Sequence, residues 1–210
     1  TASSFFIKKI SRGEGIEKEI LDTMLMKVDS NVDRAARIIN HMRQFARKTD
    51  MALEKISIND VLVSAFEIFS QQLKVRGIAV IKDMHPELPK IYADPSRLEQ
   101  VFINLLLNAR DAIEEKMSAA SRADLEERIT LKTYQDGDRV VAEVCDTGVG
   151  IPKHVAEKIF EPFFTTKEVG AGTCLGLSIS YGIVKDCGGT IMALPNKDQG
   201  ACFIVSFPLA

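Results

Sequence analysis

The chain has 210 residues, a formal net charge of −2, 46% hydrophobic residues and 27% charged residues. This composition is typical of a soluble globular protein that is long enough to bury a substantial core. The near-neutral charge gives no electrostatic reason to expect nucleic acid or an anionic membrane as the main partner. No run approaches the roughly 18 apolar residues of a bilayer span, and the N-terminus has no signal-peptide pattern.

The cysteines carry no recognisable metal or disulfide pattern. The four cysteines are Cys145, Cys174, Cys187 and Cys202. None of them belongs to a C-x-x-C pair or has a histidine next to it. We therefore expect reduced cytosolic thiols, and neither a metal site nor a disulfide framework.

Residues 1–50 are predicted to form a partial helical hairpin. A short amphipathic stretch ends at Gly13 and Gly15, and a long helix without glycine or proline follows over 16–48. Its apolar residues recur in the heptad pattern of a helical bundle. Because a lone hairpin has too little surface, we expect residues 1–48 to form a homodimer through a four-helix bundle. Packing of the helix on the domain that follows it in the chain is the alternative.

Residues 51–56 are predicted to be a linker, and residues 57–210 a separate α+β domain. The expected helices cover 57–73, 95–117 and 175–186. The expected strands cover 78–82, 91–93, 129–135, 140–145, 190–194 and 201–207. This order predicts an α/β sandwich in which a mixed sheet carries helices on one face.

Three motifs in this domain together describe an ATP site. Asp146-Thr-Gly-Val-Gly-Ile-Pro152 places a carboxylate beside a glycine turn that a flat ring can approach. Upstream, Asn104, Asn108 and Asp111 share one face of a helix, and an amide oxygen is a suitable hard ligand for Mg²⁺. Downstream, Gly170-Ala-Gly-Thr-Cys-Leu-Gly-Leu177 opens a helix whose N-terminus can receive phosphates. The two common nucleotide motifs, G-x-x-x-x-G-K-[ST] and a strand-borne G-x-G-x-x-G, are absent.

With Phe160-Glu-Pro-Phe-Phe-Thr-Thr-Lys167 between them, these motifs resemble the catalytic and ATP-binding domain of sensor histidine kinases, a branch of the Bergerat-fold ATPases. The resemblance is close over 57–210 and looser over 1–50. The phenylalanine segment is similar to the kinases and not to the topoisomerase, mismatch-repair or chaperone branches. The resemblance implies a Bergerat-type α/β sandwich preceded by a helical hairpin that dimerises, with ATP and Mg²⁺ as cofactors.

The resemblance also implies residue roles. Asp146 would accept a hydrogen bond from the adenine amine, and Asn108 would bind Mg²⁺ together with phosphate oxygens. Asn104 and Asn108 are the catalytic candidates. The other ATP-binding candidates are Asp111, Gly148, Gly150, Ile151, Phe160, Thr165, Thr166, Lys167, Gly170, Gly172, Thr173, Leu175, Gly176 and Leu177. The structural alternatives are a strand-ending turn at Asp146, a capping role for Asn108 and core packing of the phenylalanines.

Two positions depart from related patterns. Asn104 stands where the hydrolytic branches carry a glutamate that activates water, and an amide cannot act as a general base. This favours phosphoryl transfer over hydrolysis, with Glu99 one turn back as the alternative base. Cys174 stands where the family has glycine, and a side chain there costs about 1 kcal/mol if the position needs a positive φ. We therefore expect weaker nucleotide binding at an unchanged site.

The chain contains no phosphoacceptor histidine in a suitable context, since neither His41, His85 nor His154 matches the family pattern. We expect the acceptor upstream of Thr1, so the fragment would bind ATP without phosphorylating itself. The intact protein would move the γ-phosphoryl of ATP to a histidine and then to an aspartate of a response-regulator receiver domain. The alternatives are a Bergerat ATPase with nucleotide-driven dimer closure and a degenerate dimerisation scaffold. A cytoplasmic location is expected, with membrane anchoring of the parent protein through upstream segments left open.

Overall fold

The computed structural model describes residues 11–12, 20–26, 28, 32, 53–119, 127–156, 158–162, 164, 175–196 and 199–210. The chain divides into two compact units, Thr1–Arg47 with Thr166–Thr173, and Lys48–Thr165 with Cys174–Ala210. In the first unit, residues 20–26 are helical. The rest of the predicted hairpin lies outside the described residues, so its dimerisation stays a prediction.

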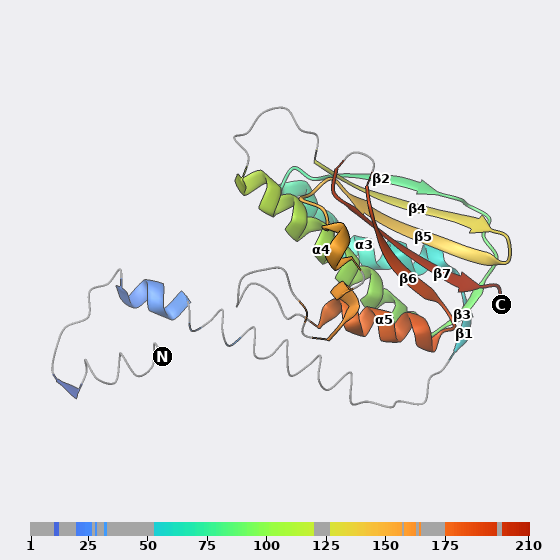
Figure 1. The fold of residues 1–210 in the computed structure, drawn as a ribbon, viewed down its shortest axis with the longest axis horizontal. Coiled ribbons are helices and arrows are strands. Elements are labelled where there is room, and N and C mark those ends of the chain that lie inside the picture. Colours follow the sequence, from blue (N-terminus) through green and yellow to red (C-terminus); the bar gives the residue numbers. More distant parts are fainter. Residues whose placement is uncertain are drawn as a thin grey trace. The chain divides into compact units, whose positions relative to one another are not determined.

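The second unit is built on a five-stranded sheet with the order β2-β4-β5-β7-β6 (Figure 1). The first pair, β2 and β4, is parallel, and the other three neighbouring pairs are antiparallel. The sheet is therefore mixed, as predicted. Its strands are β2 (Ala79–Met84), β4 (Arg128–Asp136), β5 (Arg139–Asp146), β6 (Thr190–Pro195) and β7 (Ala201–Pro208).

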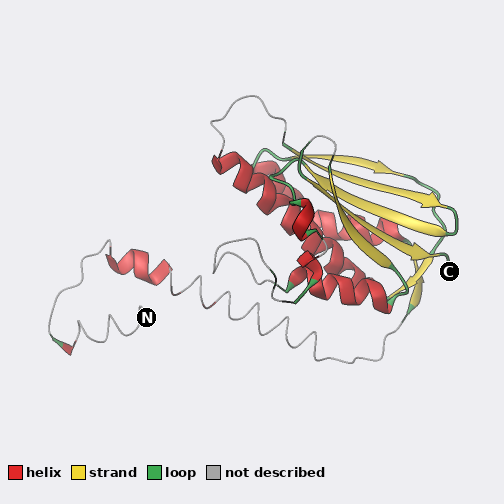
Figure 2. Ribbon diagram, viewed as in Figure 1, coloured by secondary structure: helices red, strands yellow, loops and turns green. Residues whose placement is uncertain are grey.

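Three helices cover one face of this sheet (Figure 2), which confirms the predicted sandwich. They are α3 (Ile58–Val75), α4 (Pro95–Ala119) and α5 (Gly176–Asp186). An apolar stripe of α4 is buried throughout: Leu98, Val101, Phe102, Leu105, Leu106 and Ala109. Helix α4 begins where Asp94 Oδ1 accepts hydrogen bonds from the backbone N–H groups of Ser96 (3.0 Å) and Arg97 (3.1 Å). Such a cap satisfies donors that have no partner inside the helix.

The predicted linker over 51–56 contains a strand that the sequence did not reveal. β1 (Glu54–Ile56) pairs antiparallel with β3 (Ile91–Ala93), with Lys55 opposite Tyr92. Three residues are too short to show an alternating pattern, and the partner strand lies far along the chain. The pairing therefore became visible only in the tertiary structure.

The prediction of reduced thiols without a disulfide is wrong for one pair. Cys145 and Cys202 form a disulfide although 57 positions separate them in the sequence. The antiparallel pairing of β5 and β7 puts them directly opposite each other. Register between distant strands leaves no short motif in the sequence, which is why cysteine spacing missed this pair. Cys187 is free and buried, and burial raises the pKa of its thiol. Cys174 lies outside the described residues.

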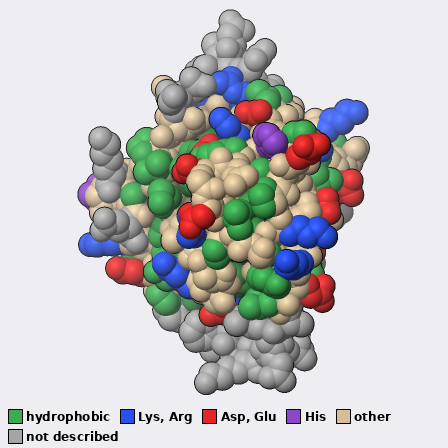
Figure 3. All heavy atoms as spheres, turned by 90° about the vertical axis from the view of Figure 1, so that its right-hand side faces the viewer, with side chains coloured by type: hydrophobic (Ala, Val, Ile, Leu, Met, Phe, Trp, Pro, Cys, Tyr) green, Lys and Arg blue, Asp and Glu red, His purple; other side chains and the backbone are tan. Residues whose placement is uncertain are grey.

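The surface of the described residues shows no single-sign charge patch in the view of Figure 3. Acidic and basic side chains are interspersed there with hydrophobic ones. This agrees with the near-neutral net charge of −2. Among the described residues, no helix combines the length and the apolar character that crossing a membrane requires.

Candidate functional site

Asp146, the last residue of β5, is the buried carboxylate of the site, with 1% of its surface exposed. Its Oδ1 accepts hydrogen bonds from the backbone N–H groups of Gly148 (2.8 Å) and Ala201 (3.2 Å). Within the described part of the chain, no hydrogen bond to Oδ2 is recorded. Among the described residues, the hydrogen bonds to this carboxylate are thus made to one of its two oxygens.

Burial raises the pKa of the Asp146 carboxyl to about 6. The hydrogen bonds from Gly148 and Ala201 and the positive charge of Lys116 act in the opposite direction, while the charge of Glu127 adds to the rise. At pH 7 the carboxyl is therefore mostly ionised in spite of its burial. An ionised carboxylate accepts hydrogen bonds strongly, which suits a ligand that offers an amine donor.

The loop after Asp146 packs tightly against α4. A Cβ atom at Gly148 would lie 2.5 Å from the backbone carbonyl carbon of Ala112, and Val149 N–H donates to the carbonyl of Ala112 at 3.2 Å. The sequence prediction assigned the glycines of this motif to close approach of a ring. The structure shows that Gly148 is needed for contact with the helix. Gly150 has a φ of +78° in the same loop.

A buried ion pair supports the loop from the other side. Lys116 Nζ lies 3.2 Å from Glu127 Oε1 and donates to the carbonyl of Thr147 at 2.6 Å. The Thr147 hydroxyl donates in turn to Glu127 Oε2 at 2.7 Å. Sequence reasoning missed Lys116 and Glu127 because only the fold brings these two side chains together.

The turn between β6 and β7 completes the surroundings of Asp146. Asn196 Nδ2 donates to the backbone carbonyl of Asp146 at 2.7 Å. Gly200 has a φ of +87°, and a Cβ atom there would lie 2.1 Å from the same carbonyl oxygen. A side chain at Gly200 is therefore excluded both by conformation and by space. The proximity of Gly200 to Asp146 leaves no signal in the sequence, because the two residues are far apart in the chain.

The three polar candidates on α4 have different surroundings. Asn104 Nδ2 donates to the carbonyl of Gly176 and to the hydroxyl of Ser180, each at 3.2 Å, so it ties α4 to α5. Asn108 is half-buried, and no hydrogen bond of its side chain to another described residue is recorded. Asp111 accepts a hydrogen bond from the neighbouring Arg110 at 2.7 Å.

Helix α5 begins at Gly176, and the preceding Leu175 provides no side-chain cap. Leu175 itself therefore satisfies none of the first-turn N–H groups through its side chain. Phe160 ends a short 3₁₀ helix, Lys158–Phe160, and its ring centroid lies 5.8 Å from that of Tyr181 on α5. Ile151, Leu175 and Leu177 are half-buried and pack against the core. The candidates Thr165, Thr166, Lys167, Gly170, Gly172 and Thr173 lie outside the described residues.

Residues 93–210 match the family described as histidine kinase-, DNA gyrase B- and HSP90-like ATPases. The chain belongs to this family. Its ATP-binding domain is of the sensor histidine kinase type, as the sequence comparison supports. The sensor kinase CckA of Brucella abortus is 39% identical over 193 residues, which cover 88% of this chain and 20% of that relative. The chain therefore spans about a fifth of the length of that relative.

Solved structures of histidine kinases share the fold of this ATPase domain. The catalytic domain of histidine kinase ThkA is 30% identical with a TM-score of 0.64, covering 76% of this chain and 97% of that one. Full-length ShkA in complex with AMPPNP is 25% identical with a TM-score of 0.71, covering 94% of this chain and 40% of that one. ThkA in complex with the response regulator protein TrrA is 24% identical with a TM-score of 0.76, covering all of this chain and 57% of that one.

The contact of Gly148 with α4 generates a first prediction. Gly148→Ala should destabilise the domain by about 1–3 kcal/mol, because the added methyl group must displace the loop from the Ala112 backbone. The measurement is the free energy of unfolding in urea. Gly182→Ala is the matched control, since a Cβ atom there meets nothing within 4 Å. That change should stabilise α5 by roughly 0.5–1 kcal/mol. Equal effects of the two substitutions would contradict the proposed contact.

The raised pKa of Asp146 generates a second prediction. Asp146→Asn should gain stability relative to the unsubstituted protein as the pH rises from about 4 to 7, reaching about 3 kcal/mol at most. The sign follows because a carboxyl whose folded-state pKa is about 6 resists ionisation on folding, and the amide does not ionise. The measurement is chemical denaturation across this pH range. Asp136→Asn, at the exposed aspartate that ends β4, reports the effect of removing a surface carboxylate. If the difference in the free energy of unfolding between Asp146→Asn and the unsubstituted protein does not change with pH, the raised pKa of Asp146 is wrong.

Proposed function

We propose that this domain binds ATP with Mg²⁺ and is the catalytic part of a protein-histidine kinase. The observation that carries the proposal is the buried Asp146 carboxylate, of which Oδ1 is held by Gly148 and Ala201 while Oδ2 has no recorded partner among the described residues. An adenine amine can donate to Oδ2. Guanine carries a carbonyl oxygen at the equivalent position, which the carboxylate repels. The site thereby selects ATP over GTP.

Asn108 would bind Mg²⁺. It lies on α4, the helix that Gly148 contacts. Its amide is half-buried and makes no recorded hydrogen bond to another described residue, so its oxygen is available to a cation. Mg²⁺ suits such a hard neutral ligand when phosphates and water complete its coordination. Bound there, Mg²⁺ would neutralise charge on the phosphates during phosphoryl transfer.

The phosphates would lie toward the N-terminus of α5. Gly176 opens this helix without a side-chain cap, so its first N–H groups can donate to phosphate oxygens. The family resemblance adds donors from Thr165, Thr166, Lys167, Gly170, Gly172 and Thr173. Leu175, Leu177, Ile151 and Phe160 would anchor these segments on the core. Asp111 would lie beside them on the polar face of α4.

Asn104 supports transfer to a protein side chain over hydrolysis. Its amide donates to α5 at Gly176 and Ser180, and an amide does not remove a proton from water at neutral pH. In the whole protein, the γ-phosphoryl would pass to a phosphoacceptor histidine and then to an aspartate of a response-regulator receiver domain. We further propose that residues 1–48 form the homodimer and that the domain works in the cytoplasm, where ATP is available.

The nucleotide assignment is tested by calorimetric titration with ATP and GTP, with and without Mg²⁺. ATP should bind at least about tenfold more tightly than GTP, and Asp146→Asn should remove this preference, because a hydrogen bond to a charged group contributes roughly 1.5–3 kcal/mol. Asn108→Ala should abolish the strengthening by Mg²⁺, and Glu115→Ala, at an exposed position on the same helix, should preserve it. Unchanged Mg²⁺ dependence in Asn108→Ala would refute the metal assignment.

The kinase assignment is tested with a longer chain that restores the upstream helix. Supplied with ATP and Mg²⁺, it should become a phosphoprotein whose label is lost in acid and kept in base, as expected of a phosphohistidine. The present 210-residue chain should stay unlabelled in the same assay. Labelling that survives acid would place the phosphoryl group on a hydroxyl and exclude the histidine-kinase reading. ATP consumption without any labelled protein would favour a Bergerat ATPase.

A further inference from the structure

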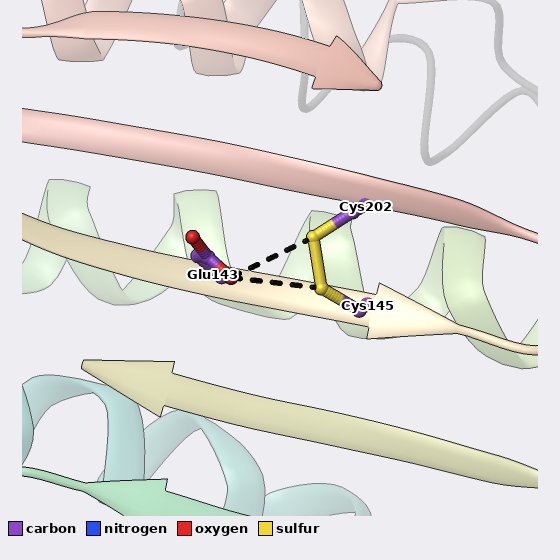
Figure 4. A group of neighbouring side chains, drawn as sticks. All are labelled: Glu143, Cys145 and Cys202. Carbon is purple, nitrogen blue, oxygen red and sulfur yellow. Dashed lines mark hydrogen bonds between the residues drawn. A yellow bond between two sulfur atoms is a disulfide. The ribbon is translucent and has the colours of Figure 1, made fainter. Parts of the chain in front are cut away.

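The side chains of Glu143, Cys145 and Cys202 lie together on the sheet face opposite to the helices (Figure 4). They come from two neighbouring strands, β5 and β7, and their ligand atoms all lie within 4.8 Å of one another. Residues 143 and 145 alternate with Ala142 and Val144, which are fully buried against the core. Asp146 belongs to the same sheet face as those buried residues. The cluster is therefore separate from the nucleotide site.

Tyr134 fixes the orientation of the carboxylate in this cluster. Its hydroxyl donates to Glu143 Oε1 at 2.8 Å. The other oxygen, Oε2, lies 4.0 Å from each of the two sulfur atoms. The nearest cation on the adjoining strand is Lys132, which interacts with Asp83 at 3.8 Å. One carboxylate oxygen is thus held in place by β4, and the second points toward the pair of sulfurs.

We propose that, when the disulfide is reduced, Glu143, Cys145 and Cys202 bind a thiophilic divalent cation of the Zn²⁺ class. Two thiolates and one carboxylate are ligands that Zn²⁺ accepts, and three protein ligands leave one position for water. A tetrahedral Zn²⁺ ion with ordinary bond lengths holds a sulfur and an oxygen about 3.6 Å apart. The observed sulfur–oxygen separation of 4.0 Å is close to this value. Once the disulfide is reduced, the two sulfurs must move apart to about 3.8 Å to share the ion.

Two cysteines that lie opposite each other on antiparallel strands can form a disulfide or, when reduced, bind one metal ion. The Cα atoms of Cys145 and Cys202 lie 3.9 Å apart, so rotation of the two side chains brings the sulfurs either to each other or to a shared ion. Zn²⁺ binds cysteine as the thiolate, and in the disulfide both sulfurs are neutral and bonded to each other. The oxidised state therefore excludes the ion.

A dithiol reductant can reduce the disulfide between Cys145 and Cys202 by thiol–disulfide exchange. One thiolate of the reductant attacks a sulfur of the disulfide and forms a mixed disulfide, and its second thiol resolves this bond. The reductant leaves as its own disulfide, and Cys145 and Cys202 are left as two thiols. Binding of Zn²⁺ then displaces the two thiol protons, so affinity should rise with pH. Tyr134 acts as a positioning residue through its hydrogen bond to Glu143.

The test measures Zn²⁺ uptake by competition with a chromophoric chelator, in the chain reduced with a phosphine. The background variant carries Cys174→Ser and Cys187→Ala, so that only the paired cysteines remain. This protein should bind one Zn²⁺ per chain when reduced and none when oxidised. Substitution of Co²⁺ should give sulfur-to-metal charge-transfer absorption, which reports thiolate ligation directly.

Single substitutions distinguish the metal ligands from Tyr134, which orients one of them. Cys145→Ser and Cys202→Ser should each abolish the stoichiometric uptake. Tyr134→Phe should weaken the affinity about tenfold, as loss of an outer hydrogen bond to a metal ligand does, and Glu143→Gln should weaken it further. Circular dichroism and thermal unfolding identify any variant that fails to fold. Uptake that persists when both cysteines are serine, or that is absent from the folded, reduced protein, would overturn the proposal.

Discussion

The buried Asp146 carboxylate is the constraint on which the nucleotide half of this domain depends. An ionised group without water needs hydrogen bonds from the protein, and Asp146 receives them from both sides of a strand pair, at Gly148 and Ala201. The two donors come from the loop that follows β5 and from the first residue of β7. The position of Asp146 is therefore fixed by the pairing of these strands as much as by its own motif. The closeness of Gly200 to its carbonyl, which leaves no room for a side chain, follows from the same pairing.

Helix α4 connects this carboxylate to the remaining polar residues. Its apolar stripe packs on the sheet, its Ala112 backbone receives the loop at Gly148, and its Asn104 side chain holds the start of α5. One helix thus sets the separation between the proposed adenine, Mg²⁺ and phosphate positions. The buried Lys116–Glu127 ion pair keeps its last turns against the same loop. This arrangement explains how a domain with few chemically reactive side chains can act by positioning a nucleotide.

Strand β5 presents different chemistry on its two faces. The inward face carries Asp146 and the apolar residues that pack against the helices. The outward face carries Glu143 and Cys145, which meet Cys202 across the strand pair. Alternation of side chains along a strand makes this division possible. The proposed metal ligands and Asp146 therefore lie on opposite faces of one strand pair, although Cys145 and Cys202 are chain neighbours of Asp146 and of its donor Ala201.

The sequence by itself determined the three helices, the strands other than β1 and the sandwich architecture of the ATPase domain, because periodic apolar patterns and turn residues act over short distances. It also determined the family, since Asn108, Asp146 and the glycine segments stand in the order that the family resemblance requires. Tertiary structure alone decided the pairing of β1 with β3, the disulfide between Cys145 and Cys202 and the roles of Lys116, Glu127 and Gly200. Each of these depends on contact between segments far apart in the chain. The register of distant strands and the approach of a loop to a helix are set by packing of the whole core, and they leave no local signal in the sequence.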